Sequence, residues 1–311
     1  MSVFLVGYIF TPWEVAQIDT FSSLLYTEKF RKVEERLRYL EGRMDPLILG
    51  VMRLAYYQLY MSDNNTERYY DEFVSLMDEL RGRYAKPKST REKMLLATVY
   101  AMGAVLYGRR RSIPKALDFG RRAFNLYREA YGEDTTVYDA LLPMGLYDYA
   151  IGYLTRSKGR KREGIRKVKV VMERGSLAKP LAYAGLVYIF VFDNKPGRAV
   201  SYGLKALHMY PESRTFRWIL GQAYLKAAMY EKALNTYREI EGDLRRRNPS
   251  CKVCIAEALY YQGESLEGMG RRKEAKSTWW RALYYLKRER DPHRRRKVEE
   301  LRKRLAKRGV R

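Results

Sequence analysis

Hydrophobic residues recur every three or four positions along most of the chain. Between Leu95 and Leu106, for example, they also occupy Val99 and Met102. This spacing is the period of an amphipathic α-helix, because residues three and four apart lie on one face. No stretch alternates between apolar and polar residues for long enough to predict a β-strand. The pattern therefore predicts an all-α protein.

Several helix starts are marked by a short polar residue followed by proline. The polar side chain caps the free amides of the first turn, and proline is tolerated at the first helical position. The junctions of this kind are Thr11-Pro12, Asp45-Pro46, Asn248-Pro249 and Asp291-Pro292. Thr11 with Glu14, and Ser89 with Glu92, also have the spacing of a capping box. Each of these sites is predicted to begin a helix.

The predicted helices form pairs, and the pairs repeat most clearly between residues 178 and 288. The marker positions of one unit are Leu220, Gly221, Tyr224, Ala233 and Tyr237. The unit before it supplies Gly185, Tyr188, Ala199, Gly203, Ala206 and Pro211, and the unit after it supplies Gly263, Leu266, Gly270, Ala275, Trp279 and Ala282. Small residues such as Gly221 and Ala233 allow two antiparallel helices to approach closely, while tyrosines fill the space beside the contact.

This arrangement resembles the tetratricopeptide repeat (TPR), whose units of about 34 residues carry L-G-x2-Y followed by A-x3-F. The resemblance implies an all-α, right-handed α-α superhelix, a TPR-like solenoid of about seven antiparallel helix pairs with a C-terminal capping helix. On this interpretation residues 1–177 are divergent helical repeats, 178–288 are clear repeats and 289–311 are a basic capping helix, all in one continuous solenoid. Other α-solenoids and irregular bundles remain the alternative, because they also place small residues at helix contacts.

In TPR proteins the first helix of each pair lines a concave groove, so the resemblance implies which residues would contact a partner. The glycine register gives Lys179, Ala182, Leu186, Trp218, Gln222, Leu225, Lys226, Tyr260, Glu264 and Glu267. The looser upstream copies add Tyr100, Tyr107 and Tyr149. Such a groove would be aromatic and mixed in charge, which suits a protein or peptide partner. The alternative is that these aromatic side chains pack between repeats.

Motifs for catalysis, cofactors and metals are scarce. The sequence contains no GxxxxGK[ST], GxGxxG or GxSxG string, which are the usual phosphate cradles and the nucleophile elbow. The only histidines, His208 and His293, have no evident nucleophile or metal partner in the sequence. Adjacent carboxylates such as Glu34 and Glu35 belong to a charged helix face. We therefore expect a non-enzymatic protein that uses no cofactor and no metal.

Cys251 and Cys254 form a C-x2-C pair. Zinc needs four ligands, and the chain has no second pair of this kind. Thioredoxin-type chemistry would require a βαβ context that the pattern does not predict. The pair is therefore interpreted as a structural disulfide or as two packed thiols, in preference to a catalytic couple.

The chain is strongly basic, with 61 Lys and Arg residues against 36 Asp and Glu and a formal net charge of +25. A surface of Lys, Arg and Glu with few amides is typical of proteins from hot environments, so we expect a thermophilic source. The charge also fits nucleic acid, above all at residues 287–311, where Val298, Leu301 and Leu305 would give a helix with a basic outer face. Elsewhere basic residues alternate with glutamate. Protein or peptide binding by a scaffold or adaptor is therefore the expected function, and nucleic-acid or anionic-surface binding through the C-terminal helix is the alternative.

No apolar stretch reaches the roughly 20 residues that a membrane-spanning helix needs. The stretch nearest the start, Val3 to Phe10, lacks the positive region and cleavage site of a secretory signal. The chain as it stands indicates a cytoplasmic location, and an upstream segment lost by truncation would indicate a periplasmic one.

Overall fold

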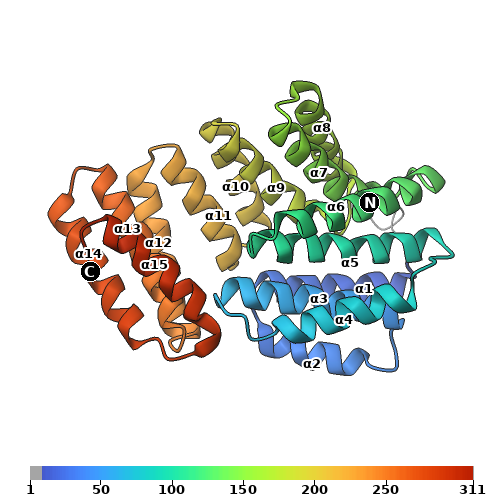
Figure 1. The fold of residues 1–311 in the computed structure, drawn as a ribbon, viewed down its shortest axis with the longest axis horizontal. Coiled ribbons are helices and arrows are strands. Elements are labelled where there is room, and N and C mark those ends of the chain that lie inside the picture. The colour runs from blue at the N-terminus through green and yellow to red at the C-terminus, as the bar shows by residue number, and fades with distance from the viewer. Residues whose placement is uncertain (1–8, 311) are drawn as a thin grey trace. The chain divides into compact units, whose positions relative to one another are not determined.

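The computed structural model describes residues 9–310, so most of the apolar stretch from Val3 to Phe10 lies outside the described residues. Throughout residues 9–310 the regular elements are helices, and no strand occurs among them (Figure 1). The all-α fold class predicted from the hydrophobic period is confirmed.

Contacts divide the chain into two compact units. Unit 1 is formed by the residues up to Leu59 together with Tyr69–Ile189, and unit 2 by Tyr60–Arg68 together with Phe190–Arg311. The helices of the first half are α1 (Pro12–Tyr26), α2 (Phe30–Leu40), α3 (Pro46–Asp63), α4 (Tyr70–Arg83), α5 (Thr90–Arg109), α6 (Ile113–Glu133), the short η1 (Tyr138–Ala140), α7 (Leu141–Leu154) and α8 (Lys158–Arg174). Those that follow are α9 (Lys179–Phe192), α10 (Pro196–Met209), α11 (Arg214–Lys226), α12 (Tyr230–Arg247), α13 (Lys252–Gly268), α14 (Arg272–Arg288), η2 (Pro292–Arg294) and α15 (Arg295–Lys307).

Helices α1 to α14 pack in consecutive pairs, and α15 follows the last pair. Small residues lie at the contacts, as predicted. In α11, a Cβ atom on Gly221 would lie 2.8 Å from the Tyr237 ring of α12. In α7, a Cβ on Gly145 would lie 2.7 Å from the backbone oxygen of Gly164 in α8. These pairs can therefore approach closely only because the two positions lack side chains.

The turn inside each pair uses the same backbone conformation. Two residues after each odd-numbered helix from α1 to α13, one residue has a positive φ. These residues are Glu28, Asn65, Arg111, Arg156, Asn194, Ala228 and Gly270. The left-handed residue reverses the chain, and in the clearest cases the next amide bonds to a carbonyl five residues earlier, as Met229 does with Tyr224. This repeated turn marks the pairs more regularly than the TPR sequence pattern does.

Most of the predicted helix starts are present, with one shift. Thr11 and Glu14 form the expected capping box at α1, and the Ser89 side chain accepts the Glu92 amide at α5. The start expected at Asn248-Pro249 is displaced, because α12 continues to Arg247 and α13 begins only at Lys252. Among the described residues no helix is both long and apolar enough to span a bilayer.

Candidate functional site

An apolar groove of about 410 Å³ lies within unit 1, and the first helices of the pairs line it. Its walls come from α1, α3, α5, α7 and the start of α9. Representative lining residues are Phe21, Leu25, Ile48, Met52, Leu95, Met102, Leu142 and Leu181. The loop that holds η1 and the loop between α8 and α9 also contribute. The groove is therefore lined by the first helices of successive pairs in the upstream half of the chain.

The deeper polar side chains of this groove already bond within the protein. The amide of Gln58 donates to the carbonyl of Met102 at 3.0 Å. The hydroxyls of Thr98 and Tyr127 lie 2.8 Å apart, and burial raises the pKa of the Tyr127 phenol. Because these groups have partners, the groove interior behaves as an apolar surface.

Asp139 fixes the loop between α8 and α9, which lines part of the groove. Its carboxylate accepts the backbone amides of Ser176 at 2.9 Å and Leu177 at 3.0 Å, just before α9 begins. Burial nevertheless raises the pKa of the Asp139 carboxyl, because desolvation outweighs the bonds to the amides. The role of Asp139 is to position this loop.

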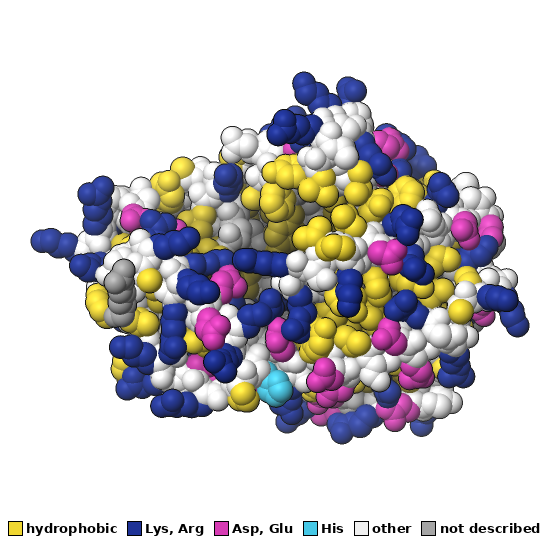
Figure 2. Space-filling model, viewed as in Figure 1, with side chains coloured by type: hydrophobic (Ala, Val, Ile, Leu, Met, Phe, Trp, Pro, Cys, Tyr) yellow, Lys and Arg dark blue, Asp and Glu magenta, His cyan; other side chains and the backbone are white. Residues whose placement is uncertain are grey.

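The rim of the groove exposes large apolar side chains. Val105, Leu146 and Leu181 are 51%, 37% and 44% exposed although they line the groove. Figure 2 shows hydrophobic side chains gathered over this part of unit 1. At the edge, the Arg174 guanidinium lies 5.7 Å from the centre of the Tyr138 ring and makes no ion pair with the described residues. A cation thus borders the apolar rim.

The upstream residues assigned to a groove from the sequence contact other helices instead of lining this one. Tyr100 and Tyr107 of α5 pack against the Phe119 ring of α6, with centroid distances of 5.6 and 5.0 Å. Tyr149 is buried in α7 and donates its hydroxyl to the carbonyl of Ile189 at 3.2 Å.

The residues assigned in α9 also lie outside the lining. Ala182 and Leu186 are both 0% exposed, and Lys179 is half-buried. The neighbouring residues Ala178 and Leu181 are the ones that line the groove.

In unit 2 the assigned residues form contacts between repeats. The Trp218 ring lies 5.3 Å from Tyr237 and 5.8 Å from Tyr261, and the Gln222 amide donates to the Tyr237 hydroxyl at 2.9 Å. Leu225 is half-buried at the end of α11, where Lys226 is exposed.

Helix α15 covers the remaining assigned residues. Tyr260 is 8% exposed, and Arg308 forms ion pairs with Glu264 at 2.7 Å and Glu267 at 2.8 Å. Arg304 approaches the Tyr260 ring to 5.9 Å. Partner binding by the ten residues assigned in α9, α11 and α13 stays a prediction. In the structure these residues make the contacts within the chain that are described above.

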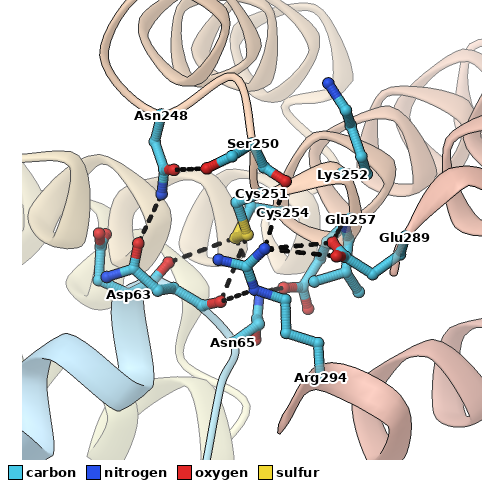
Figure 3. The surroundings of a disulfide bond; sticks show 12 residues. Asp63, Asn65, Asn248, Ser250, Cys251, Lys252, Cys254, Glu257, Glu289 and Arg294 are labelled. Carbon is cyan, nitrogen blue, oxygen red and sulfur yellow. Dashed lines mark hydrogen bonds and ion pairs between the residues drawn. A yellow bond between two sulfur atoms is a disulfide. The ribbon is translucent and has the colours of Figure 1, made fainter. Parts of the chain in front are cut away.

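A second feature is the disulfide between Cys251 and Cys254 at the start of α13 (Figure 3). Its sulfur atoms face the end of α3, which belongs to unit 2 from Tyr60 onward. No group of three or more His, Cys, Asp or Glu side chains within residues 9–310 is arranged to hold a metal ion.

No protein-family model matches the sequence, and a search of curated proteins finds no match. Among solved structures, a Rap protein complexed with competence and sporulation factor is 11% identical, with 95% of this chain and 87% of that chain covered and a TM-score of 0.50. BtubC (BKLC) from P. vanneervenii is 16% identical, with coverages of 87% and 89% and a TM-score of 0.40. The apo quorum sensor NprR from B. thuringiensis is 11% identical, with coverages of 87% and 98% and a TM-score of 0.29. Such identities bear on the fold alone. The paired helices and the likeness to the Rap protein show a TPR-like fold, as the repeat pattern in residues 178–288 predicted.

Proposed function

We propose that this protein is a non-enzymatic scaffold that binds a segment of another protein in the apolar groove of unit 1. The observation that carries the proposal is the exposed apolar rim formed by Val105, Leu146 and Leu181 around an apolar floor. Burying a large apolar side chain contributes about 1.5 to 3 kcal/mol, so a partner that covers these three residues gains substantial affinity. The Rap protein of similar fold is itself complexed with a factor, which is consistent with this use of the architecture.

The partner segment that fits this groove best is an amphipathic α-helix with acidic flanks. The walls are helices whose backbone groups bond internally, and the deeper polar side chains have partners. The groove therefore offers few hydrogen-bonding groups to the backbone of an extended peptide. A helix satisfies its own backbone and presents apolar side chains at i, i+3, i+4 and i+7. An acidic flank would meet Arg174, and the charge of +25 attracts acidic partners in general.

The test uses a labelled peptide of Leu, Ala and Glu of about 18 residues, long enough to form a helix. Fluorescence anisotropy measures its affinity for the wild-type protein and for a Val105→Glu, Leu181→Glu variant. We expect the variant to bind at least about tenfold more weakly, because two apolar contacts become charged. Leu154→Glu is the matched control, since Leu154 is 62% exposed in α7 but does not line the groove. It should bind like the wild type.

Further variants and peptides test the charge, the helical form and the location of the bound partner. Arg174→Glu should weaken binding of this peptide, and a peptide with Lys in place of Glu should bind poorly. A peptide with two central prolines cannot form the helix, and equal binding of that peptide would refute a helical partner. Loss of binding in Trp218→Ala but not in Val105→Glu, Leu181→Glu would place the partner on the downstream residues assigned from the TPR register.

A further inference from the structure

The end of α3 leaves two carbonyl groups without backbone partners. Asn65 has a φ of 48°, and the Thr66 amide donates to the carbonyl of Met61 at 3.1 Å. In a helix end of this type the earlier carbonyls are satisfied, whereas those of the last helical residue and the cap are not. Here these are the carbonyls of Asp63 and Asn64.

Each of these carbonyls faces one sulfur of the disulfide, whose surroundings are drawn in Figure 3. The Asn64 oxygen lies 3.3 Å from Cys251 Sγ, and the Asp63 oxygen lies 3.6 Å from Cys254 Sγ. The Arg294 Nε atom also donates to the Asn64 oxygen at 3.2 Å. Among the described residues, Cys254 is the one side chain within hydrogen-bonding distance of the Asp63 carbonyl oxygen.

We propose that Cys251 and Cys254 form a redox-controlled clasp for residues 60–68, which goes beyond the proposed binding function and is independent of it. A disulfide sulfur has no proton to donate, whereas a thiol is a donor. In the dithiol form both S–H groups donate to the carbonyls of Asp63 and Asn64 and cap the end of α3. The dithiol therefore holds this segment more firmly than the disulfide does.

The interconversion is a thiol–disulfide exchange with a thiol reductant such as glutathione. Two reductant thiols supply two electrons and two protons, the S–S bond between Cys251 and Cys254 breaks, and the reductant leaves as its own disulfide. The thiols so formed are buried and face the carbonyl oxygens of Asn64 and Asp63.

Apart from a 3.9 Å contact between the Asn65 side-chain amide and Cys254 Sγ, the other anchors of the segment do not involve sulfur, so the segment stays docked in both redox states. Asp63 pairs with Arg214, which also bonds to Asp243 at 2.7 Å. The Asn65 side-chain amide donates to the Glu257 carboxylate at 2.8 Å. What changes with the redox state is therefore the capping of α3 and not the position of the whole segment.

Access to the disulfide is through the turn before α13. Cys251 is 0% exposed and Cys254 is 1% exposed, whereas Ser250 is exposed. The turn is held by a bond from the Asn248 amide to Asn64 and by Arg294, which donates to the Ser250 carbonyl at 3.2 Å. Exchange with a reductant consequently requires local opening of this turn.

Hydrogen exchange of the full chain, with and without dithiothreitol, tests the proposal, and thiol alkylation verifies each redox state. We expect amides of residues 60–68 to exchange about threefold more slowly in the reduced protein, as one or two added hydrogen bonds imply. If the disulfide acts only as a structural cross-link, reduction should change the exchange rate in the opposite direction. Loss of the cross-link gives the unfolded chain more freedom and speeds exchange. Equal or faster exchange of residues 60–68 after reduction would overturn the clasp.

Paired variants keep the test independent of the cross-link. Cys251→Ser with Cys254→Ser supplies two hydroxyl donors, and it should retain slow exchange at residues 60–68 whether or not reductant is present. Cys251→Ala with Cys254→Ala removes donors and cross-link together, and it should exchange at least as fast as the oxidised protein. Identical exchange in the two double variants would also refute the proposal, since only the donors distinguish them.

Discussion

At the scale of single residues, two glycines bring the backbones of α7 and α8 close together in unit 1. A Cβ atom on Gly164 would lie 2.5 Å from the carbonyl oxygen of Gly145 and 2.6 Å from the amide nitrogen of Tyr149. A flexible side chain can move aside, but a helix backbone cannot do so without shifting the whole helix. The contact between α7 and α8 therefore depends on glycine at both positions.

Gly164→Ala should lower the free energy of unfolding by about 2 kcal/mol or more, because the added methyl group overpacks a backbone contact. Chemical denaturation followed by circular dichroism measures this loss. Gly82→Ala in α4 is the matched control, since its Cβ would meet no atom within 4 Å. Alanine there should stabilise the helix by about 0.5 to 1 kcal/mol. A similar effect at both positions would contradict the packing of α7 on α8.

At the scale of elements, the helices were predictable but their terminations were not. Left-handed residues end the odd-numbered helices, yet Arg111, Arg156 and Ala228 are not residues that favour this conformation. Only Gly270 and the two asparagines carry the usual signal. Packing of the paired helices fixes the turn, so local sequence preference is overridden.

Replacing such a residue by glycine tests whether the turn is strained. Ala228→Gly should raise the free energy of unfolding by about 0.5 to 1 kcal/mol, because glycine adopts a φ of 55° without the penalty of a Cβ atom. Thermal and denaturant unfolding measure the gain. In the adjacent control, Ala227→Gly, φ is −83° and the substitution only adds freedom to the unfolded chain. A gain in stability there too would show that the turn does not explain the effect.

The groove of unit 1 was harder to predict than the helices, for a physical reason. Hydrophobic periodicity identifies apolar faces, but it does not separate side chains that fill the core from those that stay exposed. Val105 and Leu181 fit the helical period as well as the buried Leu106 and Leu186 do. The TPR register also selected Trp218 and Tyr260, which contact neighbouring helices of unit 2. Tertiary packing decides which of these stripes remains open.

At the scale of the whole molecule, the charge is high but dispersed. Figure 2 shows Lys and Arg side chains scattered over the visible face, with Asp and Glu among them. In α15 the apolar stripe of Val298, Leu301 and Leu305 is buried, as the sequence predicted. Several basic residues of this helix are engaged within unit 2, such as Lys297, which pairs with Glu257 at 2.6 Å. The basic outer face is therefore narrower than the sequence alone indicated.

These contacts determine how the alternative function must be tested. Deleting residues 287–311 would remove Leu301 from the core and Arg294 from the end of α3, so any lost binding could reflect unfolding. Lys303 and Lys307 are exposed and make no ion pair with the described residues. Lys303→Glu with Lys307→Glu reverses charge on the outer face of α15 while leaving its buried stripe intact.

We expect no specific nucleic-acid binding at physiological salt, despite the net charge of +25. Sequence-tolerant binding proteins combine a continuous basic groove with aromatic platforms, whereas the groove of unit 1 is apolar and Arg308 is neutralised by Glu264 and Glu267. Contacts to phosphates by scattered lysines are weak and decline steeply with salt. Fluorescence anisotropy with labelled single- and double-stranded oligonucleotides across a salt series measures this directly. Sub-micromolar affinity that persists at about 0.15 M salt and is lost in the Lys303→Glu, Lys307→Glu variant would instead establish α15 as a nucleic-acid-binding surface.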